Sequence, residues 1–170
     1  MDYTHLPKIE LHLHLDCSLS YAVVQKLDPK ISLEVYHKHF VGPVKCLDLV
    51  DFITRAEKAI SLMQTPEQLR LVTIALFQQL AADRVIYAEI RFAPLEHTRL
   101  GLSPTEVVQV VNDAVLEGIA ATGIEARIIL CTLRHYNEAQ SMETVELVEN
   151  FAGTMVVGFD IASDEAGFPI

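Results

Sequence analysis

The 170-residue sequence predicts an α/β protein of the (β/α)8 TIM-barrel type, with only about the first four βα units present. Two observations favour this fold. Apolar, β-rich runs alternate with amphipathic segments in steps of roughly 30 residues, and no glycine-rich turn follows the first run. An open doubly wound sheet, the competing fold, often carries such a turn, whereas this chain has Asp16-Cys17-Ser18 there. We therefore expect residues 1–170 to form the N-terminal half of a single barrel domain.

Four runs are expected to form parallel strands. The first alternates leucine and histidine strictly, and the others are rich in apolar and β-branched residues, as a sheet covered on both faces requires. The runs span residues 8–15, 85–93, 126–133 and 154–161.

Helix start signals stand between these runs. Thr65 and Ser103 each precede a proline and are followed three residues later by Gln68 or Glu106, the pattern of a capped first turn. Gly123 is placed to end the second of these helices. A third helix is expected over 137–150, and 18–62 reads as mostly helical with an interruption around residues 42–43.

Charge and composition exclude several classes of protein. Thirteen Lys and Arg against 23 Asp and Glu give a formal net charge of −10, which repels nucleic acid and favours a small neutral substrate or a metal cation. The apolar runs are far shorter than the ~20 residues of a membrane span. No signal-peptide pattern is visible, and Cys17, Cys46 and Cys131 show no CxxC pair. We expect a cytoplasmic protein with reduced cysteines.

The first strand carries the clearest chemistry. His12 and His14 are two residues apart, so both imidazoles point to one face, and Asp16 continues that face at the carboxyl end of the strand. Neutral imidazole nitrogens suit zinc, so this strand is a candidate metal site. The alternative is a polar strand face that happens to use histidine.

The later strands offer candidates with two readings each. Arg91 on the second strand forms either a polar layer beneath an active site or a salt bridge inside the barrel. His135, after the third strand, either reaches a substrate or packs against its neighbours. Asp160, Asp164 and Glu165 surround the end of the fourth strand, and one of them is a candidate to hydrogen-bond a metal-ligating histidine. A charged, solvated loop explains Asp164 and Glu165 equally well.

The remaining histidines and a buried methionine complete the expectations. Polar, loop-like surroundings predict that His5, His37, His39 and His97 lie on the surface. Met63 is expected in the core.

Four ordered motifs resemble the adenosine and adenine deaminases. They are Leu6-Pro-Lys-Ile-Glu-Leu-His-Leu-His-Leu-Asp16, Tyr87-Ala-Glu-Ile-Arg-Phe-Ala-Pro94, Ile129-Leu-Cys-Thr-Leu-Arg-His135 and Val156-Val-Gly-Phe-Asp-Ile-Ala-Ser-Asp-Glu165. The resemblance covers essentially the whole chain. It implies a zinc-dependent barrel that hydrolytically removes the 6-amino group of adenosine or a related aminopurine.

The resemblance also implies roles for single residues. His12 and His14 would be two of the zinc ligands, and Asp16 would hydrogen-bond the ribose. The backbone N–H at Ser163 would meet a purine ring nitrogen, and Phe52 would belong to a hydrophobic lid. The family's third metal histidine, its catalytic glutamate in a His-Ala-Gly-Glu stretch and its metal-binding aspartate have no match in these 170 residues. The catalytic acid and base are therefore expected beyond residue 170.

Two positions depart from the family pattern, because Cys17 and Ser163 stand where glycine is usual. The substrate is thus either adenosine or another amino-heterocycle. Two alternatives stay open. One is a non-catalytic half-barrel that pairs with itself or with a partner chain through its open sheet edges, and the other is a different metal-dependent amidohydrolase.

Overall fold

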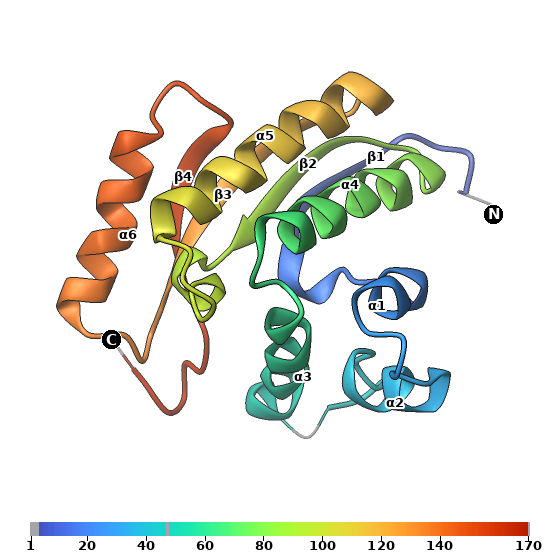
Figure 1. The fold of residues 1–170 in the computed structure, drawn as a ribbon, viewed down its shortest axis with the longest axis horizontal. Helices are drawn as coiled ribbons and strands as arrows, with labels where there is room; N and C mark the ends of the chain where they lie inside the picture. The colour runs from blue at the N-terminus through green and yellow to red at the C-terminus, as the bar shows by residue number, and fades with distance from the viewer. Residues whose placement is uncertain (1–3, 47, 170) are drawn as a thin grey trace.

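The computed structural model describes residues 4–46 and 48–169, with the side chains of residues 50 and 52 outside the described part. The four expected strands are all present and form one parallel sheet in the order β1-β2-β3-β4 (Figure 1). The strands are β1 Lys8–His14, β2 Val85–Phe92, β3 Glu125–Leu133 and β4 Val156–Ala162. Sequential parallel strands joined through helices are the architecture of a partial (β/α)8 barrel, as expected.

The register of the sheet brings the strand ends together. His14 of β1 lies opposite Arg91 of β2, and Cys131 of β3 lies opposite Asp160 of β4. The first strand ends one residue earlier than expected, because a 3-10 turn, η1 (Leu15–Cys17), follows His14 directly. The polar side chains at the carboxyl ends of the four strands therefore share one edge of the sheet.

Three long helices cover one face of the sheet (Figure 1). Both capped starts are confirmed: Thr65 and Ser103 each complete a reciprocal capping box, with Gln68 and Glu106. Gly123 ends the second helix in the left-handed conformation, with φ of 74°. The helices are α4 Pro66–Ala82, α5 Pro104–Thr122 and α6 Glu138–Asn150.

The segment between β1 and α4 is mostly helical, as the sequence predicted, and it is divided into three helices. They gather beyond the carboxyl end of β1, away from the layer formed by α4 and α5 (Figure 1). The third contacts both η1 and a second 3-10 turn, η2 (Pro94–His97), that follows β2. These helices are α1 Tyr21–Leu27, α2 Leu33–His39 and α3 Leu49–Ser61.

The apolar core lies between the sheet and the covering helices. Ile90, Ile128 and Leu130 project from the strands against helical residues such as Phe77 and Val111, and all are buried. Met63 is fully buried, as expected. Within the described residues, no helix combines the length and the apolar character that a bilayer crossing needs.

Candidate functional site

A cavity of about 380 Å³ lies at the carboxyl ends of the strands. In parallel α/β folds this edge of the sheet carries the functional groups, because the loops that follow the strands converge there. The cavity gathers seven of the eight residues singled out from the sequence: His12, His14, Asp16, Arg91, His135, Asp160 and Ser163. The eighth, Phe52, lies in α3, and its side chain is outside the described part of the structure.

His12 and His14 point the same way from β1. Their ring centroids lie 5.2 Å apart, and their Nε2 atoms approach to 3.3 Å. Burial lowers the pKa of His14 to about 4, with further contributions from the charges of Arg91 and His12. His14 is therefore neutral near pH 7, which is the form that carries a free lone pair for a metal ion.

Arg91 joins β1 to β4 beneath the two histidines. Its Nη1 lies 2.7 Å from Nδ1 and 3.2 Å from Nε2 of His12, and its Nη2 forms an ion pair with Asp160. The Arg91 side chain is only 7% exposed, so its charge needs this carboxylate partner. Of the two interpretations of Arg91 from the sequence, the structure shows the salt bridge, which Arg91 forms with Asp160.

Asp16 is a buried carboxylate in η1, just past the carboxyl end of β1. The residue is 7% exposed, and its Oδ1 has no hydrogen-bond partner in the described part of the structure. Burial, and secondarily the charge of Glu96, raises the pKa of Asp16 to about 6, although a hydrogen bond with Cys17 works in the opposite direction. Nδ1 of His14 lies 3.7 Å from Oδ1, beyond hydrogen-bond distance. A buried acceptor without a hydrogen bond is costly unless a ligand satisfies it.

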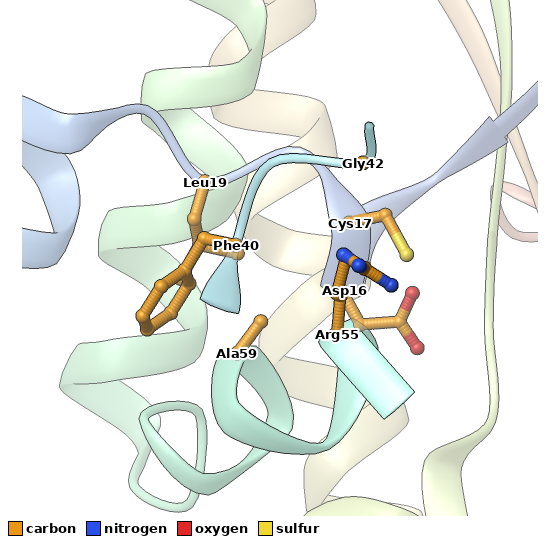
Figure 2. Close-up of a pocket in the computed structure, with 7 residues that line it drawn as sticks. All are labelled: Asp16, Cys17, Leu19, Phe40, Gly42, Arg55 and Ala59. Carbon is orange, nitrogen blue, oxygen red and sulfur yellow. The ribbon is translucent and has the colours of Figure 1, made fainter. Parts of the chain in front are cut away.

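A smaller cavity of about 70 Å³ adjoins Asp16 on the side of α3 (Figure 2). Cys17 and Arg55 line it, and Figure 2 shows both close to Asp16. Arg55 is engaged within its own helix, where its Nη1 lies 3.1 Å from Oδ1 of Asp51. Asp16 and Cys17 line both cavities, so the smaller cavity is a side pocket of the main one.

Ser163 and His135 lie on the side of the cavity formed by β3 and β4. Ser163 has φ of 93°, a conformation that favours glycine. This backbone matches the sequence expectation that the position is usually glycine. The ring of His135 packs edge-to-face against Tyr136 and at a tilt against Phe168, with ring centroids 5.0 Å and 5.9 Å apart. His135 thus both packs against its neighbours and borders the cavity.

The surface assignment of His97 is wrong. His97 is fully buried, and its Nδ1 lies 2.9 Å from the backbone oxygen of Met63 at the end of α3. Burial lowers its pKa to about 4. His5 and His37 are exposed as expected, and His39 is half-buried.

Three charged cavity residues, Glu57, Glu96 and Arg99, were missed from the sequence. Glu96 belongs to η2, immediately after β2, and its carboxylate accepts a hydrogen bond from the hydroxyl of Tyr136 at 2.7 Å. The position of Glu96 in the sequence could have identified it, because loops that directly follow barrel strands carry functional groups.

Within residues 4–46 and 48–169, no three His, Cys, Asp or Glu side chains are grouped to hold a metal ion. The two histidines of β1 therefore offer two protein ligands, whereas a closed zinc site uses four and a catalytic one usually three.

Comparisons with known proteins identify the family. The profile of the family described as adenosine deaminase matches residues 7–170. Adenosine deaminase from Enterococcus faecalis is 36% identical over 170 residues, which cover 96% of this chain and 50% of that protein. The chain spans about half the length of the curated relatives it matches.

Solved structures agree on the fold. A Burkholderia ambifaria amidohydrolase with bound zinc superposes with a TM-score of 0.82 at 21% identity, over 98% of this chain and 47% of that one. Adenine deaminase from Arthrobacter aurescens gives a TM-score of 0.81 at 24% identity, over 96% of this chain and 50% of that one.

Proposed function

This chain belongs to the adenosine deaminase family, and we propose that it supplies half of the active site of an enzyme that hydrolyses the 6-amino group of adenosine or a related aminopurine. The observation that carries the proposal is the approach of His12 Nε2 to His14 Nε2, at 3.3 Å. Two nitrogens bound tetrahedrally to one zinc ion at about 2.0–2.1 Å lie about 3.3–3.4 Å apart. The pair therefore has the spacing of two ligands of one zinc ion.

The surroundings of the pair fit a metal ion in charge and in shape. His14 is neutral near pH 7, and the positive charge of Arg91 is offset by Asp160. A zinc ion held there supplies the acidity that makes water a nucleophile at neutral pH. His12 then uses Nε2 as a ligand and keeps its proton on Nδ1, so its contact with the Arg91 guanidinium, which only donates, has to open.

The rest of the cavity provides the substrate contacts. Oδ1 of Asp16, which accepts no hydrogen bond in the described structure, is an acceptor for a sugar hydroxyl. The backbone N–H of Ser163 is a donor for a purine ring nitrogen. Leu49 borders the cavity from α3, consistent with a lid over an apolar ring, and we assign Phe52 to the same lid.

Both edges of the sheet support the assignment of residues 1–170 to half of a barrel. Within the described residues, β1 and β4 each have a neighbouring strand on one side only. Apolar side chains on these strands are exposed where a complete barrel would cover them: Ile9 58%, Leu11 59%, Val157 57% and Phe159 45%. A half-barrel that associates with a second copy would cover the same surface, so it remains the second candidate.

The test uses the complete barrel, in which this chain is joined to the second half of the Enterococcus faecalis relative. We expect zinc-dependent conversion of adenosine and water to inosine and ammonia. The reaction is monitored through the loss of adenosine absorbance. His12→Ala and His14→Ala should abolish it. A folded, zinc-loaded complete barrel that leaves every aminopurine unchanged would refute the proposal.

A further inference from the structure

Glu96 is a carboxylate fixed in place on the wall of the main cavity, and the roles assigned above leave it unused. Its side chain is 20% exposed, and it follows the end of β2 by four residues. His12 and His14 lie within β1, whereas Glu96 lies past the end of its neighbour β2. Arg99, beside it, is 51% exposed. Glu96 therefore lies further past the carboxyl ends of the strands, the side on which such a barrel opens, than the two histidines.

The backbone of η2 is clamped on both sides of this carboxylate. The buried side chain of Gln64 donates to the backbone oxygen of Glu96 at 2.9 Å and accepts from the backbone N–H of Arg99 at 2.9 Å. The buried ring of His97 adds its contact with Met63. These bonds tie η2 to the end of α3, so the position of Glu96 is set by buried groups.

The carboxylate itself is held by two donors. The hydroxyl of Tyr136 donates to Oε1 at 2.7 Å, and Arg99 Nη2 donates to Oε2 at 2.8 Å. Burial and the neighbouring Glu96 raise the pKa of Tyr136, so its hydroxyl keeps the proton that it donates. Each carboxylate oxygen accepts up to two hydrogen bonds, so capacity for a further donor remains.

We propose that Glu96 accepts a hydrogen bond from a hydroxyl group of the substrate's sugar, and that the site thereby selects a nucleoside over the free purine base. This inference rests on the proposed function. The reacting amino group must face His12 and His14, so the group that the substrate presents toward the mouth is the substituent on the opposite side of the purine. A free base has no hydroxyl there, and it leaves this carboxylate without its donor.

Charge supports a neutral donor at this position. Five carboxylates line this cavity against two guanidinium groups: Asp16, Glu57, Glu96, Asp160 and Glu165 against Arg91 and Arg99. This excess of negative charge disfavours a phosphate and favours hydroxyl groups, which donate to carboxylates. The ligand class is therefore an unphosphorylated nucleoside.

The test compares Glu96→Ala and Glu96→Gln with wild type in the complete barrel. The substrates are adenosine, its 2′-, 3′- and 5′-deoxy analogues, and adenine. We expect Glu96→Ala to raise KM for adenosine at least tenfold with kcat changed less than threefold. KM should not rise in this way for adenine, nor for the one deoxy analogue that lacks the contacted hydroxyl. Tyr136→Phe, which frees the carboxylate to turn, should raise KM for adenosine by about threefold.

The matched control is Glu117→Gln, a carboxylate exposed on α5 and paired with Arg70 at 2.5 Å, which should leave all five substrates unaffected. The inference is wrong, while the proposed function stands, if neither variant changes KM for adenosine relative to KM for the analogues and adenine. Circular dichroism must show that Glu96→Gln is folded. An equal loss of kcat on every substrate would also overturn it, since that marks a purely structural role. A wild-type barrel inactive on all five substrates would refute the proposed function as well.

Discussion

The Nε2 atoms of His12 and His14 lie 3.3 Å apart on one face of β1. Residues two apart on a strand share a face, so the backbone alone brings both rings to the same side. The rings then converge, tilted 51° to each other, and the ring of His12 contacts Arg91 of the Arg91–Asp160 ion pair. Two imidazole nitrogens at this spacing match two corners of a tetrahedral zinc site.

Asp16→Asn should stabilise the fold while weakening substrate binding. The buried Oδ1 of Asp16 has no hydrogen-bond partner in the described structure, and an amide removes the cost of burying a charge there. We expect the free energy of unfolding, measured in urea at about pH 8, to rise by about 1–2 kcal/mol. In the complete barrel, KM for adenosine should rise at least tenfold.

The control for this variant is Asp113→Asn on the exposed side of α5, which should change the free energy of unfolding by less than about 0.5 kcal/mol. A lower free energy of unfolding for Asp16→Asn would show that the carboxylate has favourable partners within the fold and needs no ligand as a hydrogen-bond donor.

Ser163→Gly should relieve backbone strain at the edge of the cavity. Ser163 holds φ of 93°, where a Cβ atom costs about 1 kcal/mol or more. Glycine loses more entropy on folding, so the net gain in the free energy of unfolding should be at most about 1 kcal/mol. Ser163→Ala keeps the Cβ atom and should match wild type within about 0.5 kcal/mol. Equal thermal midpoints for all three proteins would contradict strain at this position.

Stability should fall on mild acidification because His97 is buried in its neutral form. Its pKa is lowered from 6.5 to about 4, so below about pH 6.5 the unfolded chain takes up a proton that the folded chain refuses until about pH 4. Stability is thus present above this window and is lost as the pH falls through it. From about pH 7 to about pH 5, this group should remove about 2 kcal/mol.

The measurement is the difference between wild type and His97→Gln in urea unfolding at the two pH values. A glutamine amide offers a donor for the backbone oxygen of Met63 and does not titrate. Wild type should lose about 2 kcal/mol more than the variant. Parallel losses in the two proteins would contradict a neutral, buried His97.

The local parts of the fold were readable from the sequence because their chemistry is local. Thr65 and Ser103 begin helices through bonds to residues only three positions away, and both capping boxes are present. The alternation of His12 and His14 sets their common face in the same way. Ser163 stands in a motif position where glycine is usual, and this indicated the positive φ that the structure shows.

The misassigned and missed residues depend on contacts that are distant in sequence. His97 looked like a surface residue in a polar segment, but its partner is the backbone of Met63, 34 residues earlier. Glu96 is fixed by Gln64 and by Tyr136, 32 and 40 residues away. No periodicity or spacing within one segment encodes such pairs.

The most direct test of the central claim is the zinc content of the purified complete barrel, measured by mass spectrometry of the metal in wild type and in His12→Ala/His14→Ala. Wild type should hold one zinc ion per barrel, and X-ray absorption at the zinc edge should report nitrogen ligands at about 2.0–2.1 Å. The folded double variant should hold none. A folded wild-type barrel without zinc after loading, or a double variant that keeps it with unchanged ligands, would contradict the assignment of His12 and His14 as metal ligands.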